Sequence, residues 1–182
     1  MQSFMPLELV EAAVRGGPPD VERLIEAVWP DAYRLAYGIL GERQSAEDVA
    51  QEACIVVYRT IVSLRDAAAF RVWFYRIVVR RATEFKKRRG RSEPVVAEIN
   101  VDDDCTSAID IWRALASLPP NLRNVVVLHY FEDLSSREIA SILRIPDGTV
   151  RFRLMTARRR LRPLLGDTQP LPANQEVYPH AI

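Results

Sequence analysis

Five arginines lie close together in the C-terminal third of the chain, and they could bind an anionic polymer. They are Arg151, Arg153, Arg158, Arg159 and Arg160. After position 147 no acidic residue occurs until Asp167. Arginines at this density repel one another unless a negatively charged partner relieves them. The chemistry that they suggest is therefore binding to nucleic acid, and the alternative is a surface-charged helix with no DNA role.

The residues around these arginines predict two short helices joined by a tight turn. Ser135 is placed to cap the first helix, with Glu138 completing a capping box. Pro146 cannot continue a helix, and Asp147 is the predicted N-cap of the second. One apolar stripe follows at helical spacing: Val150, Leu154, Ala157 and Leu161. This is the pattern of a DNA-binding helix-turn-helix, with Arg151, Phe152 and Met155 off the stripe near the amino end of the second helix.

A second basic segment, residues 70–89, combines aromatic residues with arginines and lysines in FRVWFYRIVVRRATEFKKRR. Aromatic rings stack on unpaired bases while cations follow the phosphates, so this helix is expected to face nucleic acid. Most of its aromatic side chains, including Trp73, are instead expected to pack in the core.

An acidic helix precedes it and is predicted to begin at Ser45. Asp48, Gln51 and Glu52 lie in its opening turns. Carboxylates at this position suit the helix dipole and need no further role. The alternative is a surface that binds a basic partner protein.

Charge is segregated along the chain, although the net charge of the 182 residues is only +1. Residues 71–91 contain nine basic side chains and one acidic, whereas residues 92–110 contain six acidic and none basic. The near-neutral total therefore conceals two separate anion-binding surfaces.

Helical periodicity predominates, so we expect an all-α fold of two small helical domains joined by an acidic linker. The expected divisions are an N-terminal extension (1–19), a first helical domain (20–91), the linker (92–106), a helix-turn-helix domain (107–165) and a tail (166–182). The first helix is expected to begin near Asp20 and to run to about Leu40, with a kink at Pro30.

Several classes of protein are disfavoured. The chain has no catalytic motif, phosphate-binding loop or metal-ligand spacing, so we expect a protein that is not an enzyme and uses no cofactor or metal. It lacks an apolar run long enough to span a membrane, and Cys54 and Cys105 are expected to be reduced thiols in a cytoplasmic protein. His129 is expected to be structural.

Three segments together resemble bacterial RNA polymerase sigma factors: AEDVAQE, WFYRI and the frame from LPPNLRN to the arginine-rich helix. The resemblance covers about residues 20–165 and is to the small extracytoplasmic-function (ECF) group, which keeps only regions two and four. It implies core RNA polymerase and promoter DNA as partners, both as duplex and as melted non-template strand. It leaves open whether an anti-sigma factor also binds.

The resemblance also implies roles for individual residues. Asp48, Gln51 and Glu52 would bind the polymerase. The minus-ten element would be contacted by Ser63, Arg65, Arg76, Arg80, Arg81, Lys86 and Lys87. The minus-thirty-five element would be contacted by Arg151, Phe152, Arg153 and Met155, with Arg158 and Arg159 on phosphate.

The chain departs from the family pattern at three of its positions. Many relatives have Asn at the position of Arg80, Ser at that of Phe152 and Arg at that of Thr156, so no known promoter sequence carries over. The alternative function is a stand-alone helix-turn-helix regulator that dimerises on a palindromic site. It accounts for residues 135–162 but leaves the basic helix at 70–89 unexplained.

Overall fold

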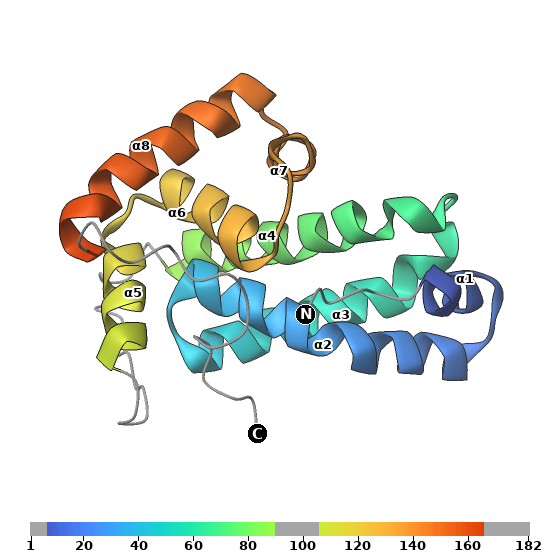
Figure 1. The fold of residues 1–182 in the computed structure, drawn as a ribbon. Helices are drawn as coiled ribbons and strands as arrows, with labels where there is room; N and C mark the ends of the chain where they lie inside the picture. Colours follow the sequence, from blue (N-terminus) through green and yellow to red (C-terminus); the bar gives the residue numbers. More distant parts are fainter. Residues whose placement is uncertain (1–6, 90–105, 166–182) are drawn as a thin grey trace.

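The computed structural model describes residues 7–89 and 106–165, and all regular structure in these two ranges is helical (Figure 1). We call residues 7–89 the N-terminal unit and residues 106–165 the C-terminal unit. The predicted all-α fold is confirmed. No helix in the described part of the chain is both long and apolar enough to cross a membrane. The predicted linker and tail lie outside the described residues, apart from Thr106.

The N-terminal unit is a bundle of four helices with two short 3-10 turns between the last two. Its elements are α1 (Leu7–Arg15), α2 (Pro18–Leu40), α3 (Arg43–Thr60), η1 (Ile61–Ser63), η2 (Ala67–Ala69) and α4 (Phe70–Arg89). α2, α3 and α4 pack on one another around fully buried side chains such as Leu24, Val57 and Phe74. α1 lies in the segment interpreted as an extension, and it buries Val10 and Ala13 against α2, η1 and η2.

The C-terminal unit contains the helix-turn-helix. Its elements are α5 (Thr106–Ser117), α6 (Pro120–Val126), a π-helical turn η3 (Val127–Phe131), α7 (Ser136–Leu143) and α8 (Asp147–Leu165). The apolar segment 125–131 could have formed a strand, but it is helical as expected, with Pro120 in the first turn of α6.

The first long helix begins earlier than its expected start near Asp20. α2 begins at Pro18, because the rings of Pro18 and Pro19 fix helical φ angles in a first turn whose N–H groups have no partner in the helix. Asp20 therefore lies within that first turn, and Gly17 is the N-cap. The helix continues through Pro30 to Leu40 and ends at Gly41, whose φ of 75° is left-handed.

The predicted N-cap of the next helix, Ser45, is wrong. α3 begins at Arg43, and Ser45 is buried in its first turn. The Ser45 hydroxyl donates to Glu42 Oε2 at 2.7 Å, and Arg89 at the end of α4 also donates to that carboxylate. These hydrogen bonds lower the pKa of Glu42. They hold the chain in a helical turn earlier than local sequence indicates.

The two units pack directly on each other. α7 contacts α4, and the two helices lie side by side in Figure 1. Both α6 and η3 contact α2. Tyr37 of α2 meets Trp112 of α5 edge to face, with 4.9 Å between ring centroids. Arg123 of α6 is buried and donates to the carbonyl of Ile39 at 3.3 Å. This contact positions the candidate binding surfaces of both units.

Candidate nucleic-acid and protein-binding surfaces

The helix-turn-helix begins with the predicted capping box, which is confirmed. The Ser135 backbone N–H donates to Glu138 Oε2 at 2.8 Å, and the Glu138 N–H donates to Ser135 Oγ at 3.3 Å. α7 ends at Leu143, and its C-cap residue, Arg144, has a left-handed φ of 54°. The following helix starts one residue earlier than predicted, because the N–H groups of Thr149 and Val150 donate to the carbonyl of Pro146. Asp147 is thus the first residue of α8 rather than its N-cap.

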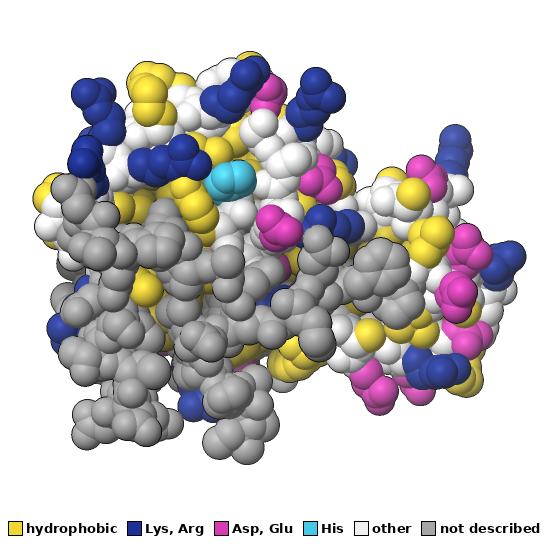
Figure 2. Space-filling model, viewed as in Figure 1, with side chains coloured by type: hydrophobic (Ala, Val, Ile, Leu, Met, Phe, Trp, Pro, Cys, Tyr) yellow, Lys and Arg dark blue, Asp and Glu magenta, His cyan; other side chains and the backbone are white. Residues whose placement is uncertain are grey.

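α8 buries one face and exposes the other. The predicted apolar stripe is confirmed: Val150, Leu154, Ala157 and Leu161 are all buried. By contrast, Phe152 and Met155 are 62% and 48% exposed. Figure 2 shows Lys and Arg side chains gathered over this part of the molecule, along its upper edge. An exposed face of this kind can enter the major groove of DNA, with the stripe anchoring the helix to its own unit.

The arginines of α8 differ in their surroundings. Arg151 forms an ion pair with Asp147 at 2.6 Å. A hydrogen bond from Ser136 and the charge of Arg151 lower the pKa of the Asp147 carboxyl. Arg158 donates to the Tyr130 hydroxyl and lies 5.5 Å from the centre of its ring. Arg159 is exposed and Arg153 half-buried.

The basic helix α4 divides its predicted DNA-binding residues between solvent and protein. Arg80 and Lys87 are exposed, and Arg80 and Arg81 both form ion pairs with Glu84, at 2.8 and 3.1 Å. Arg76 instead donates to the backbone carbonyl and the hydroxyl of Ser141 in α7, both at 3.0 Å.

Lys86 also points toward protein, because its Nζ donates to the carbonyl of Ile39 at 3.1 Å. Burial, aided by the charge of Arg123, lowers the pKa of Lys86 to about 8. Arg76 and Lys86 are therefore both bound to backbone at or near the contact between the units.

The loop between α3 and α4 is held by short local bonds. Ser63 and Arg65 are both exposed. The Ser63 hydroxyl donates to the carbonyl of Thr60 at 2.7 Å. Asp66 caps η2 by accepting from the N–H of Ala68 at 2.9 Å. Trp73 is half-buried, packs against the core and lies 5.8 Å from the ring of Phe70, as expected for a packing residue.

A groove between α4 and α7 was not identified from the sequence. It is lined by apolar side chains, including Trp73 and Ile142, and by the cations Arg80, Lys87 and Arg144. Helical periodicity in the sequence could not single out Arg144, because this residue lies in the turn of the helix-turn-helix. The groove therefore adds one cation from the C-terminal unit to the basic face of α4.

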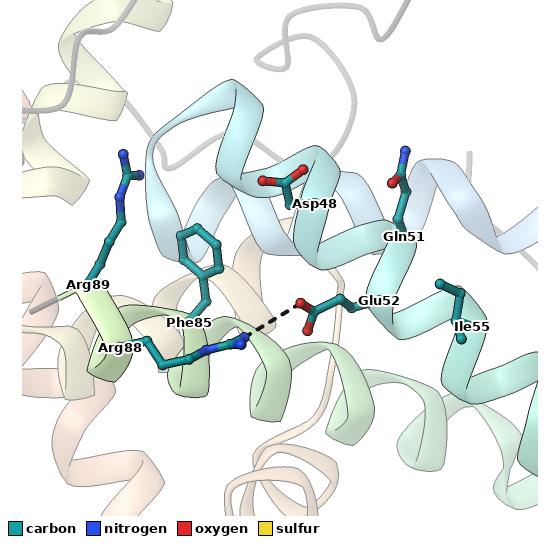
Figure 3. Close-up of a pocket in the computed structure, with 7 residues that line it drawn as sticks. All are labelled: Asp48, Gln51, Glu52, Ile55, Phe85, Arg88 and Arg89. Atoms are coloured by element: carbon teal, nitrogen blue, oxygen red, sulfur yellow. Dashed lines mark ion pairs between the residues drawn. The ribbon is translucent and has the colours of Figure 1, made fainter.

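The predicted protein-binding residues share a second hollow, between α3 and α4 (Figure 3). Asp48 and Gln51 are exposed, and Glu52 forms an ion pair with Arg88 at 3.6 Å. Two apolar side chains that were not singled out from the sequence, Ile55 and Phe85, also line the hollow, together with Arg88 and Arg89. Ile55 is 49% exposed, which is unusual for a large aliphatic side chain beside carboxylates.

The described residues contain no cluster of three or more His, Cys, Asp or Glu side chains that could hold a metal ion. Cys54 is a buried free thiol, and burial raises its pKa to about 11. Cys105 lies outside the described residues. His129 bonds through Nδ1 to the carbonyl of Leu134 at 2.9 Å, which agrees with its expected structural role.

Comparison with known proteins identifies both units. Residues 24–92 match the family model of sigma-70 region 2, and residues 108–161 match that of sigma-70 region 4. RNA polymerase sigma-H factor of Pseudomonas aeruginosa is 31% identical, covering 87% of this chain and 94% of that protein. ECF RNA polymerase sigma factor SigW of Bacillus subtilis is also 31% identical, covering 85% and 94%.

The fold agrees with these matches. The solved sigma factor RpoE, in complex with the anti-sigma factor NepR from Bartonella quintana, aligns with a TM-score of 0.74 at 21% identity. The alignment covers 82% of this chain and 99% of that one. The chain therefore belongs to the ECF group of RNA polymerase sigma factors, which act with core RNA polymerase at promoter DNA to initiate transcription.

Proposed function

We propose that α8 reads the minus-thirty-five element through the exposed face at its amino end. Arg151, Phe152, Arg153 and Met155 meet base edges, and Arg158 and Arg159 bind phosphate. The observation that supports this assignment most strongly is the division of α8 into a buried apolar stripe and an exposed basic face. A phenyl group at position 152 can contact a thymine methyl but cannot donate a hydrogen bond to guanine.

The minus-ten element is bound by the loop after α3 and by α4. Its residues are Ser63, Arg65, Arg76, Arg80, Arg81, Lys86 and Lys87. The exposed Arg65, Arg80 and Lys87 are available in the described arrangement. Arg76 and Lys86 are bonded to Ser141 and Ile39, so they reach DNA only after those bonds break.

The hollow between α3 and α4 binds core polymerase. Asp48, Gln51 and Glu52 offer acceptors to a basic partner helix, and the exposed Ile55 beside them supplies apolar contact. The two arginines that line the hollow, Arg88 and Arg89, are already paired with Glu52 and Glu42. A hollow that combines carboxylates with an exposed aliphatic side chain therefore suits a protein partner better than a nucleic acid, because DNA phosphates repel carboxylates.

These contacts position and melt DNA without covalent chemistry, so the protein is not an enzyme and requires no cofactor. Polymerase holds both units at a fixed span, which turns two weak DNA contacts into one strong interaction. Capture of each unstacked base contributes about 1–3 kcal/mol to strand opening. The protein acts in the cytoplasm with the polymerase.

The organisation proposed is a region two domain at 20–91 and a region four domain at 107–165, joined by the acidic segment 92–106, with an N-terminal extension (1–19) and a C-terminal tail (166–182). The two family matches fall inside these boundaries to within one residue. An anti-sigma factor is a further proposed partner, supported by the similarity of fold to a sigma factor solved with one.

Run-off transcription with core polymerase on a library of upstream sequences tests these assignments. We expect the full chain to direct transcripts from a defined subset of templates. Glu26→Gln, an exposed change on α2, serves as the control and should leave that subset unchanged. A chain that fails to bind polymerase, but binds a palindromic duplex as a dimer, would instead be a stand-alone regulator.

A further inference from the structure

A carboxyl group is buried at the contact between the two units. Glu132 follows η3, and its side chain is 1% exposed. The Tyr75 hydroxyl of α4 donates to its Oε2 at 2.8 Å. Its Oε1 is also buried and has no hydrogen-bond partner among the described residues. The carboxyl of a C-terminal-unit residue thus lies among side chains of the N-terminal unit.

A second carboxyl and two guanidinium groups lie around Glu132. On α2, Asp31 is 2% exposed and pairs with Arg34, whose Nη2 is 3.8 Å from Glu132 Oε2. On α4, Arg71 donates to the backbone carbonyl of Glu132. Arg71 is also 3.8 Å from the carboxylate of Glu138 at the rim of the contact. Each guanidinium is thus shared with another acceptor, so neither serves Glu132 alone.

Ionised Glu132 would place a second negative charge close to Asp31 with incomplete compensation, in a site that excludes water. Burying an ionised carboxylate without full hydrogen bonding is costly, and protonation avoids that cost. When the units separate, Glu132 reaches water and this constraint disappears. The two arrangements therefore favour different protonation states of one side chain.

We propose that Glu132 is protonated while the two units are packed together and ionised when they separate, so that separation releases a proton and closure takes one up. The proposal goes beyond promoter recognition, because it concerns the free chain. Arg76, which is bonded to Ser141 across the same contact, is freed by the same separation. Proton release and exposure of a predicted DNA-binding residue are thereby coupled.

The electrostatics of the site agree with the geometry. Burial raises the pKa of Glu132 from its ordinary value of 4.5 to about 7; Asp31 adds to the increase, and Arg34, Tyr75 and Arg71 oppose it. A carboxyl whose pKa is higher in the closed state than in the open state stabilises the closed state. This stabilisation is fully present at pH values below the pKa of the open state. The stabilisation is lost as pH rises through the pKa of the closed state.

The expected pH window follows from these two limits. Between pH 5 and 7, the equilibrium constant for separation should rise by up to about tenfold per pH unit, since one proton is released. Above about pH 7 this dependence should level off. Lys86, which donates to the carbonyl of Ile39 within the N-terminal unit, has a pKa of about 8. It therefore titrates above the range from pH 5 to 7.

Thiol labelling can detect separation even when open molecules are rare. Val127 is buried where η3 meets α2, so Val127→Cys places a thiol that reacts only after opening. The full chain would carry Val127→Cys together with Cys54→Ala and Cys105→Ala. A disulfide reagent that reacts in mild acid, 4,4′-dithiodipyridine, would be used from pH 5 to 7.5. The same measurement is made on Glu132→Gln in this background. Dividing the first labelling rate by the second removes the effect of pH on the ionisation of the probe thiol.

We expect the labelling rate of the Glu132 chain, divided by that of Glu132→Gln, to rise up to about a hundredfold from pH 5 to 7 and then to level off. Glu26→Gln on the solvent side of α2 should behave as the unchanged chain. Glu132→Leu gives a second uncharged reference if the amide prevents folding, as judged by circular dichroism. A ratio that stays constant across the range, with either reference, overturns the proposal.

Discussion

Gly38 of α2 and Val127 of η3 approach so closely that a methyl group on Gly38 would lie 2.6 Å from Val127 Cγ1. No side-chain carbon tolerates that distance, and the branched valine has little freedom to move away. The absence of a side chain at position 38 therefore permits the C-terminal unit to pack on α2.

Gly38→Ala is therefore expected to weaken the packing of the units. Overpacking costs about 1–3 kcal/mol, and the better helix propensity of alanine returns at most about 1 kcal/mol. Urea unfolding of the full chain measures the change. Adding Val127→Ala to Gly38→Ala should recover part of the loss, because the new methyl group then has space. Purely additive losses in this double-mutant cycle would show that the two residues do not interact.

Ser135→Ala should destabilise the helix-turn-helix, because the N–H of Glu138 loses its acceptor at the start of α7. The expected decrease in the free energy of unfolding is about 1 kcal/mol. Chemical denaturation checks it, with Arg137→Ala in the same exposed turn as the control. The control should change stability by less than about 0.5 kcal/mol. Equal losses in both variants would mean that the capping box contributes nothing specific.

Arg151→Ala and Arg159→Ala should affect DNA binding in different ways. Loss of a base contact at Arg151 should cost about 1–3 kcal/mol at one upstream position and relax specificity there. Loss of a phosphate contact at Arg159 should weaken all sequences similarly and reduce the slope of log K against log salt by about one. Binding of polymerase holoenzyme to a promoter library at several salt concentrations separates the two. A uniform loss for Arg151→Ala would reassign it to phosphate.

Ile55→Asp should weaken binding to core polymerase if the hollow between α3 and α4 is the docking surface. A carboxylate in place of an exposed aliphatic side chain removes apolar contact, and we expect affinity to fall at least about tenfold, or ~1.4 kcal/mol. Competition with a labelled sigma factor for core enzyme measures it. Leu164, another exposed aliphatic residue at the end of α8, offers the matched change Leu164→Asp. Similar losses at both sites would argue against a specific role for the hollow.

The features that were predicted correctly depend on neighbours in the sequence. The capping box of Ser135 and Glu138 spans one helical turn, and the stripe of α8 recurs at a fixed period. Such patterns are local, so the sequence alone is enough to predict them. The family resemblance rests on the order and spacing of such segments and was confirmed by the matches to regions 2 and 4.

The features that were missed depend on distant residues. The start of α3 at Arg43 rests partly on Arg89, which comes 47 positions after Glu42. Likewise, nothing near Arg76 indicates that Ser141, 65 residues later, will accept its hydrogen bonds. Neither Tyr75 nor Glu132 has a local signal for burial, because an ordinary tyrosine and glutamate become buried only when the units meet. The roles assigned to single site residues remain predictions.

The π-helical turn of η3 has a consequence for the spacing of this segment. In it the N–H of Glu132 donates to the carbonyl of Val127, five residues earlier, at 3.3 Å. Such a turn amounts to one residue inserted into an α-helix. Deleting a single residue there would restore ordinary helical geometry and rotate everything after it by about 100° about the helix axis. Segment length is thus as decisive as residue type, because an otherwise harmless shortening would carry the acidic side chain out of its site.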